Sequence, residues 1–290
     1  MAQSTPATMH ELYGEHFPGD EAIQEVAATS LNPRSPEILY GAFAQFAVGS
    51  ADVIADIGSR DASYAVELHR RFGCRVLAVD PVPLHSKLAQ QTVAEANLTR
   101  SIEVIEAGIE AMPLADGALD AIWCRDVLNH VDIVTGLNEC ARVLKPGGGM
   151  LVYQTFATAD LEPNEAARLY RSMAIVPSNM DPTFFEATAL NAGFVISAHD
   201  VIDSEWRENW AESGYRDPGK DLLAIARLRR REPELVARFG RAQYEATLGG
   251  TLWGVYQFLG KLRPQVYLLH RTGGVSDLAI APGWNPTESG

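Results

Sequence analysis

Two carboxylates and one glycine turn are the residues of this sequence whose spacing could bind a nucleoside. Asp56 lies near the end of a short apolar run, residues 53–57, and Gly58 follows that run directly. Asp80 ends a second apolar run, residues 75–79. A glycine turn before a helix lets backbone N–H groups face a polar ligand, and an acid about 20 residues further on can accept the hydroxyl groups of a ribose. The spacing therefore predicts a strand–turn–helix unit that binds a nucleoside.

The elements that would position these carboxylates alternate between strand and helix patterns. Short apolar runs bounded by turn residues indicate buried strands, and apolar residues spaced three and four apart indicate helices. The predicted strands are 53–57, 75–79, 101–105, 119–124, 150–153, 194–201 and 265–270. The predicted helices include those from about 62, 84–97, 132–144, 162–173 and 181–191. This alternation predicts a doubly wound, mostly parallel α/β sheet, whose ligands bind beyond the carboxyl ends of its strands.

Helical segments are expected on either side of that core. Ser35-Pro36-Glu37 predicts a helix start, because the serine can cap it and the proline needs no N–H there. Residues 204–263 show helical patterns and no strand pattern, which is typical of a lid over a site. The predicted organisation is an N-terminal helical segment (1–49), a Rossmann-like core (50–203), a helical lid inserted between late strands (204–263), and a last strand with a tail (264–290).

Composition narrows the classes of partner. The formal net charge of −13 argues against binding to nucleic acid and to an anionic membrane surface. With 47% hydrophobic residues among 290, the chain can bury a full core. The three cysteines show neither metal-ligand spacing nor a disulfide framework, so no metal is expected. We find neither a signal pattern nor an apolar run of about 18 residues. We therefore expect a cytoplasmic protein with a small-molecule substrate, and the sequence leaves open whether it forms a homodimer.

Two stretches carry a resemblance to a known family. Residues 108–131 (GIEAMPLADGALDAIWCRDVLNHV) and 141–148 (ARVLKPGG) resemble the middle and the fifth-strand signature of class I S-adenosylmethionine-dependent methyltransferases. The resemblance covers about residues 50–200 and implies a Rossmann-like fold. It also implies S-adenosyl-L-methionine as cofactor, S-adenosyl-L-homocysteine as product, and in-line methyl transfer to a small metabolite. The layout of 204–263 resembles members that methylate small molecules, including glycine-derived methylamines.

The resemblance implies a role for each matching residue. The glycine loop around Asp56 would face the methionine part of the cofactor, Asp80 the ribose and Pro81 the adenine. The loop after the fourth strand would lie between cofactor and substrate. The implied cofactor-binding residues are Asp56, Gly58, Ser59, Arg60, Asp80, Pro81, Ile109, Glu110, Arg125 and Val127.

Two residues are the candidates for a general base. His130 belongs to the loop that resembles the one between methyl donor and acceptor, and a histidine can accept a proton near neutral pH. Tyr153, at the end of the fifth predicted strand, is the reserve candidate, although a phenol is a poor base at neutral pH. A structural histidine beside a helix start is the alternative interpretation of His130.

Three positions depart from the family pattern, which usually reads Asp-x-Gly-x-Gly-x-Gly in the first loop. Arg60 and Ala62 replace its second and third glycines, and Gly108 stands where an acid commonly meets the adenine amine, with Glu110 as a substitute. Ala62 is expected to crowd helix against strand only mildly. These departures keep open a non-catalytic or atypical S-adenosylmethionine-binding protein. A nicotinamide-dependent oxidoreductase is less favoured, because the loop lacks the glycines that let a pyrophosphate approach.

Overall fold

The computed structural model describes Met9 and residues 21–273. The chain divides into two compact units, residues 1–33 and 34–290. In the first unit, helix α1 (Glu21–Ala28) buries none of its residues. The weakly helical pattern that the sequence shows before Glu21, from about Glu11, lies outside the described residues, as does the tail after Gly273.

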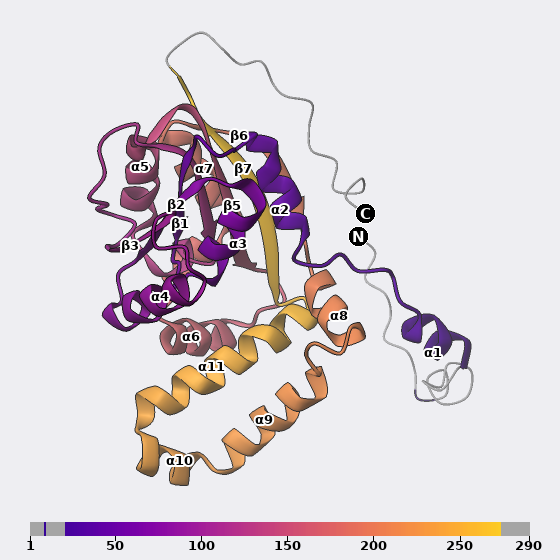
Figure 1. Cartoon of the computed structure of the whole chain (residues 1–290). Coiled ribbons are helices and arrows are strands. Elements are labelled where there is room, and N and C mark those ends of the chain that lie inside the picture. Colours follow the sequence, from indigo (N-terminus) through magenta and orange to yellow (C-terminus); the bar gives the residue numbers. More distant parts are fainter. Residues whose placement is uncertain (1–8, 10–20, 274–290) are drawn as a thin grey trace. The chain divides into compact units, whose positions relative to one another are not determined.

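A seven-stranded sheet organises the described part of the second unit (Figure 1). Its order is β3-β2-β1-β4-β5-β7-β6, and β1 to β5 pair in parallel, whereas β7 runs antiparallel to both β5 and β6. The order reverses between β1 and β4, which is where ligands of such sheets bind. The strands are β1 (Val53–Ile57), β2 (Arg75–Asp80), β3 (Ile102–Glu106), β4 (Leu119–Arg125), β5 (Leu144–Ala157), β6 (Phe194–Val201) and β7 (Leu262–Arg271).

Helices cover both faces of the sheet, and each face has its own apolar core. The alternation of side chains along β4 explains this, since Trp123 packs in one core and its neighbours Ile122 and Cys124 pack in the other. Helices on the Trp123 face are α2 (Ile38–Phe43), α3 (Ser63–Phe72) and α4 (Pro83–Glu95), and those on the other face are α5 (Ile133–Val143) and α7 (Pro182–Asn191). The expected mostly parallel, doubly wound fold is confirmed.

Side-chain caps set several of these helix starts. Asp132 accepts from the N–H groups of Val134 and Thr135 at 3.1 and 3.2 Å, so α5 begins where the sequence predicts. Helix α2 begins at Ile38, later than expected. The N–H groups of Ile38, Leu39 and Tyr40 donate to carbonyls three residues back, so residues 35–37 form a turn before the helix. A short 3₁₀ turn, residues 44–46, continues α2.

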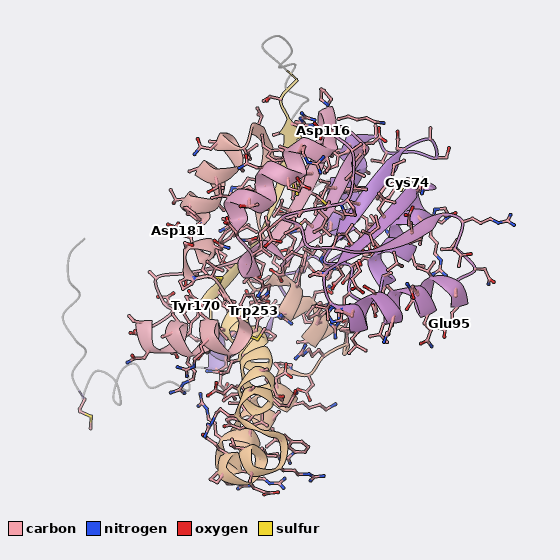
Figure 2. The ribbon with its side chains drawn as sticks, turned by 90° about the vertical axis from the view of Figure 1, so that its left-hand side faces the viewer. Cys74, Glu95, Asp116, Tyr170, Asp181 and Trp253 are labelled. Carbon is pink, nitrogen blue, oxygen red and sulfur yellow. The ribbon has the colours of Figure 1, made fainter. Side chains whose placement is uncertain are left out.

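Four late helices lie in the chain between β6 and β7 (Figure 1). They are α8 (Glu205–Glu212), α9 (Pro218–Arg230), α10 (Glu232–Phe239) and α11 (Arg241–Phe258). Because Leu262 of β7 pairs with Ala157 at the end of β5, the chain returns from these helices at the carboxyl edge of the parallel strands. Helix α11 packs on α6 (Pro163–Met173) in a third apolar core, to which Tyr170 and Trp253 contribute (Figure 2). No helix within the described residues is long and apolar enough to cross a membrane.

One arginine joins the start of the second unit to this late region. Arg34 donates from Nη1 to Asp200 at 2.7 Å and from Nε to Glu205 at 2.6 Å. Its backbone N–H also reaches Glu205, at 3.1 Å. The Arg34 and Asp200 side chains are only 22% and 10% exposed, so solvent screens the pair weakly. The contacts fix the end of β6 and the first turn of α8 to the segment before α2.

We expect Arg34→Gln to lower the free energy of unfolding by about 1.5–3 kcal/mol, because hydrogen bonds to two charged groups are lost. Urea denaturation would measure the change. Arg75→Gln is the control, since the Arg75–Glu103 pair is 55% and 56% exposed and should contribute less than about 1 kcal/mol. Equal losses in the two variants would contradict a special role for Arg34.

Candidate functional site

The turn after β1 is held against the end of β2. The N–H groups of Gly58 and Ser59 both donate to the carbonyl of Val79, at 2.8 and 3.1 Å. Gly58 has a φ of +72°, and a Cβ there would lie 2.3 Å from Cγ2 of Val127. Only glycine fits this position, because both the backbone conformation and the space exclude a side chain. Val127 follows β4, so the turns after β1 and β4 meet at Gly58.

The two residues that stand in place of glycines in this loop adopt an unfavourable backbone conformation. Arg60 and Ala62 have φ angles of 51° and 61°, the left-handed region that L-residues avoid at about 1–2 kcal/mol each. Only mild crowding of helix against strand was expected at Ala62. The strain was not predicted, because position 62 favours glycine through its backbone angle and not through the space around it. The backbone of the loop thus follows a left-handed path typical of glycine, although residues 60 and 62 are not glycines.

Asp80 holds this strained path in place. Its Oδ2 accepts from the N–H of Arg60 at 3.0 Å, and its Oδ1 accepts from the N–H of Val82 at 2.9 Å. His85 of α4 also contacts Oδ1, at 2.9 Å from Nδ1. A carboxylate offers about four lone-pair sites, so Oδ2 retains capacity for a ligand hydroxyl. Sequence reasoning did not find His85, although a histidine in the first turn after a strand-ending acid was a usable signal.

The residues implied for the adenine differ in what they offer. Pro81 is exposed beyond β2, next to Val82, which is 41% exposed. The Ile109 side chain is buried and packs against Gly136 of α5, so only its backbone groups remain for a ligand. Oε2 of Glu110 would lie 2.9 Å from a Cβ on Gly108, so the Glu110 carboxylate occupies the space beside that glycine.

Asp56 is a buried carboxylate at the same edge. It accepts a hydrogen bond from the N–H of Ala65, in the first turn of α3, and its Oδ2 has no partner among the described residues. Burial raises the pKa of Asp56 to about 7, and the charge of Arg125 opposes that rise only in part. The sequence predicted that loop N–H groups would satisfy this acid, whereas in the structure a helix N–H contacts it and one oxygen is left over.

Unpartnered polar atoms gather around the glycine turn. Besides Oδ2 of Asp56, the buried Oγ of Ser59 and Nε of Arg125 have no hydrogen-bond partner within residues 21–273. Such atoms are costly in a folded protein unless a ligand or water meets them. An acid and an arginine together match the ammonium and carboxylate groups of an amino acid. The residues present therefore fit the methionine end of S-adenosylmethionine.

The two candidate bases lie in different surroundings. His130 is exposed, with Nδ1 3.3 Å from the carbonyl of Ala174, and it closes a 3₁₀ turn, residues 128–130. Asn179 holds that turn by donating to the carbonyls of Leu128 and Val131, at 2.7 and 2.9 Å. Sequence reasoning did not find Asn179.

Tyr153 is almost fully buried and stacks on Trp206 of α8, with ring centroids 4.5 Å apart. Burial raises the pKa of its hydroxyl well above the usual range. The phenol therefore stays protonated near neutral pH, which argues against Tyr153 as a base.

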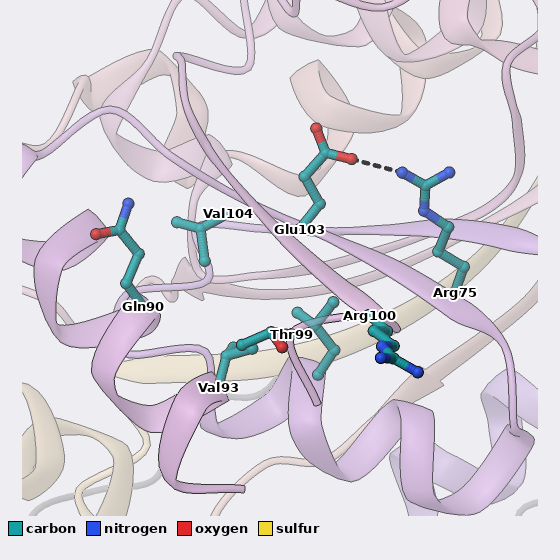
Figure 3. Close-up of a pocket in the computed structure, with 8 residues that line it drawn as sticks. Arg75, Gln90, Val93, Thr99, Arg100, Glu103 and Val104 are labelled. Atoms are coloured by element: carbon teal, nitrogen blue, oxygen red, sulfur yellow. Dashed lines mark hydrogen bonds and ion pairs between the residues drawn. The ribbon is translucent and has the colours of Figure 1, made fainter. Parts of the chain in front are cut away.

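A cavity of about 410 Å³ lies away from this edge (Figure 3). Gln90 of α4 lines it together with Arg75 and Glu103, which form an ion pair at 2.6 Å. Arg75 and Glu103 stand at the amino ends of β2 and β3, opposite the edge where ligands of parallel sheets bind. We therefore place the candidate site at the carboxyl edge, around Gly58 and Asp80.

The chain is similar to known methyltransferases over its core. Residues 55–152 match a family model described as a methyltransferase domain. A sarcosine/dimethylglycine N-methyltransferase of Halorhodospira halochloris is 26% identical over 148 residues, which are 51% of this chain and 53% of that relative. The match thus spans about half the length of that relative.

Solved structures share the fold over more of the chain. The [4+2]-cyclase SpnF has a TM-score of 0.64 at 16% identity, covering 82% of this chain and 81% of the other. A geranyl diphosphate C-methyltransferase from Streptomyces coelicolor A3(2), crystallised with Mg²⁺, geranyl diphosphate and S-adenosyl-L-homocysteine, has a TM-score of 0.59 at 16% identity. That match covers 81% of this chain and 80% of the other. At these identities the likeness shows the fold alone.

The raised pKa of Asp56 predicts a pH dependence of stability. Between the ordinary value of 3.8 and about 7 the folded state binds more protons than the unfolded state, so stability falls as pH rises through that range. Asp56→Asn should remove this fall, giving a variant that gains on the wild type from pH 5 to pH 8 in urea denaturation. Asp116→Asn is the control, because the Asp116 side chain is 80% exposed. Parallel pH profiles of wild type and Asp56→Asn would contradict the assignment.

Proposed function

We propose that the protein transfers a methyl group from S-adenosylmethionine to a small-molecule metabolite, because residues 55–152 match the methyltransferase domain model and the sheet has the class I methyltransferase fold. The observation that carries the proposal is the cluster at the carboxyl edge. There, Asp80 and the Gly58 turn meet the unpartnered atoms of Asp56 and Arg125, at the point where the strand order reverses.

Each part of the cluster would hold one part of the cofactor. Asp80 would accept the ribose hydroxyls, and Pro81 would cover the adenine. Asp56 would accept from the ammonium group, and Arg125 would face the amino-acid end. When bound, S-adenosylmethionine supplies a methyl group on a positively charged sulfur that is already a good leaving group. The protein then needs to align the acceptor, exclude water and, for some acceptors, remove a proton.

We propose that the late helices α8–α11 act as the lid over this site. Their connections to β6 and β7 lie at the carboxyl edge, and Trp206 of α8 stacks on Tyr153 of β5. A lid there would close over a pocket that suits a metabolite and excludes water. The division into a helical segment (1–49), a core (50–203), a lid (204–263) and a tail (264–290) belongs to this proposal.

We also place the protein in the cytoplasm in this proposal, because Cys74, Cys124 and Cys140 are all free and buried, as in proteins of reducing compartments. The absence of nucleic-acid binding and the formation of a homodimer stay predictions.

A second candidate function is that of an S-adenosylmethionine-binding protein without methyl transfer. Arg60 and Ala62 favour it, because they place side chains where the family's first loop has glycines, and the Arg60 side chain can fill space that the cofactor would otherwise enter. Transfer of a labelled methyl group from the cofactor to any metabolite would exclude this candidate.

The binding step is tested with S-adenosylhomocysteine. Calorimetry should show binding by the wild type, and Asp80→Asn should weaken it by about 1.5–3 kcal/mol, the loss of hydrogen bonds to a charged group. Glu103→Gln is the control, because Glu103 is an exposed acid at the other end of the sheet. Absence of binding by the wild type would remove the proposed function and leave the fold unchanged.

The proton-transfer step is tested at His130, which we propose as the general base. If the acceptor must lose a proton, His130→Gln should lower kcat by about 10²–10⁴ and remove the acid limb of the pH–rate profile. Cofactor affinity should change little. A fully active variant that keeps its acid limb would leave His130 as a residue that shapes the loop.

A further inference from the structure

Two partly buried arginines near the carboxyl edge have no carboxylate partner among the described residues. Arg125 ends β4, and Arg207 lies on α8. Both guanidinium groups are near enough to Tyr153 to act on the pKa of its hydroxyl, which each of them lowers against the stronger effect of burial. Arg34 shows the contrast, since it reaches two carboxylates. Sequence reasoning did not single out Arg207.

Arg125 is held by aromatic rings. Its guanidinium carbon lies 4.1 Å from the ring centroid of Tyr64 and 5.4 Å from that of Tyr153. The acid next to it in the chain, Asp126, accepts instead from the N–H of Thr155 at 3.0 Å. The charged guanidinium of Arg125 is therefore held in place by stacking on aromatic rings and not by an ion pair.

Arg207 is held by an amide and a ring. Its Nε donates to Oε1 of Gln257 on α11 at 2.5 Å, and its guanidinium carbon lies 4.7 Å from the ring centroid of Trp210. Burial lowers the pKa of Arg207, so the surrounding protein does not compensate its charge in full. Among the described residues, no hydrogen bond from the remaining N–H groups of its guanidinium is present, so these groups can meet an acceptor.

The unpartnered polar atoms beside Arg207 include two donors. Nε1 of Trp206 and Nε2 of Gln257 are buried without a partner in the part of the chain that the structure describes, and Gln257 is the residue that Arg207 contacts. Trp206 stacks on Tyr153. Buried donors around an incompletely compensated guanidinium call for an anion with several acceptor sites.

We propose that Arg207, Trp206 and Gln257, which we call the Arg207 site, bind a carboxylate of the methyl acceptor. A carboxylate is planar and accepts two parallel N–H bonds from a guanidinium. Arg125 adds positive charge near Tyr153, and the aromatic rings supply apolar walls. The inference rests on the proposed function, because it takes the bound anion to be the molecule that receives the methyl group.

Binding measurements on the full chain test the site directly. The probes are acetate, N,N-dimethylglycine and phenylacetate, each compared with its primary amide, with and without saturating S-adenosylhomocysteine. Calorimetry and tryptophan fluorescence should show at least one carboxylate binding about tenfold or more tighter than its amide. Arg207→Gln should reduce that preference by about tenfold or more, until carboxylate and amide bind about equally, and Arg207→Lys should keep part of it.

Arg216→Gln is the matched control, because Arg216 lies beyond α8 and pairs with Asp221 at 2.7 Å. It should keep the preference for the carboxylate. Equal binding of carboxylates and amides by the wild type, or an unchanged preference in Arg207→Gln, would overturn the proposal.

A second comparison separates the two sources of a carboxylate. S-adenosylhomocysteine carries one and 5′-methylthioadenosine does not. If Arg207→Gln weakens only S-adenosylhomocysteine, the carboxylate belongs to the cofactor, and the assignment to the acceptor is overturned. A wild type that prefers carboxylates but does not bind S-adenosylhomocysteine would refute methyl transfer, and with it the assignment of the carboxylate to a methyl acceptor. A wild type that binds S-adenosylhomocysteine without preferring carboxylates would refute the Arg207 site and leave the proposed function standing.

Discussion

The carboxylate of Asp80 is the constraint on which the site depends. It accepts from the N–H of Arg60 in the turn after β1 and from the N–H of Val82 before α4, so a single side chain joins the two connections that flank the ligand edge. The left-handed angle of Arg60 is tolerable because its N–H gains a charged acceptor. The turn also contains Gly58, against which Val127 packs. By holding this turn, Asp80 therefore also helps to position the loop after β4.

Much of this arrangement could be predicted from the sequence, because it depends on local patterns. Two apolar runs, one with Asp56 near its end and one followed by Asp80, marked the two strands and their carboxyl edge, and Asp132 marked the start of α5. The direction of β7 could not be predicted, since a run such as 265–270 reads the same whether its neighbours are parallel or antiparallel. The left-handed φ angles of Arg60 and Ala62 could not be predicted either, because the path of the loop imposes them.

The residues that the sequence did not single out share one property, which is a polar role fixed by distant partners. Asn179 looks unremarkable in the chain, and Arg207 reads as a surface residue until Gln257 and Trp210 contact it. Ile109 shows the opposite case, because a position implied for a ligand gives its side chain to the packing of α5. Burial of a polar or apolar group is a tertiary property, so neither case leaves a mark in periodicity.

The antiparallel pairing of β6 with β7 has a consequence for how the fold can change. Val201 pairs with Gln265, so the two strands form a hairpin whose connection happens to be four helices long. The entropic cost of closing a connection rises only with the logarithm of its length, about 0.6 kcal/mol for each doubling. Such a connection can be lengthened, shortened or exchanged while the register of the sheet stays the same. The carboxyl edge of the parallel strands and the late helices can thus change independently of one another.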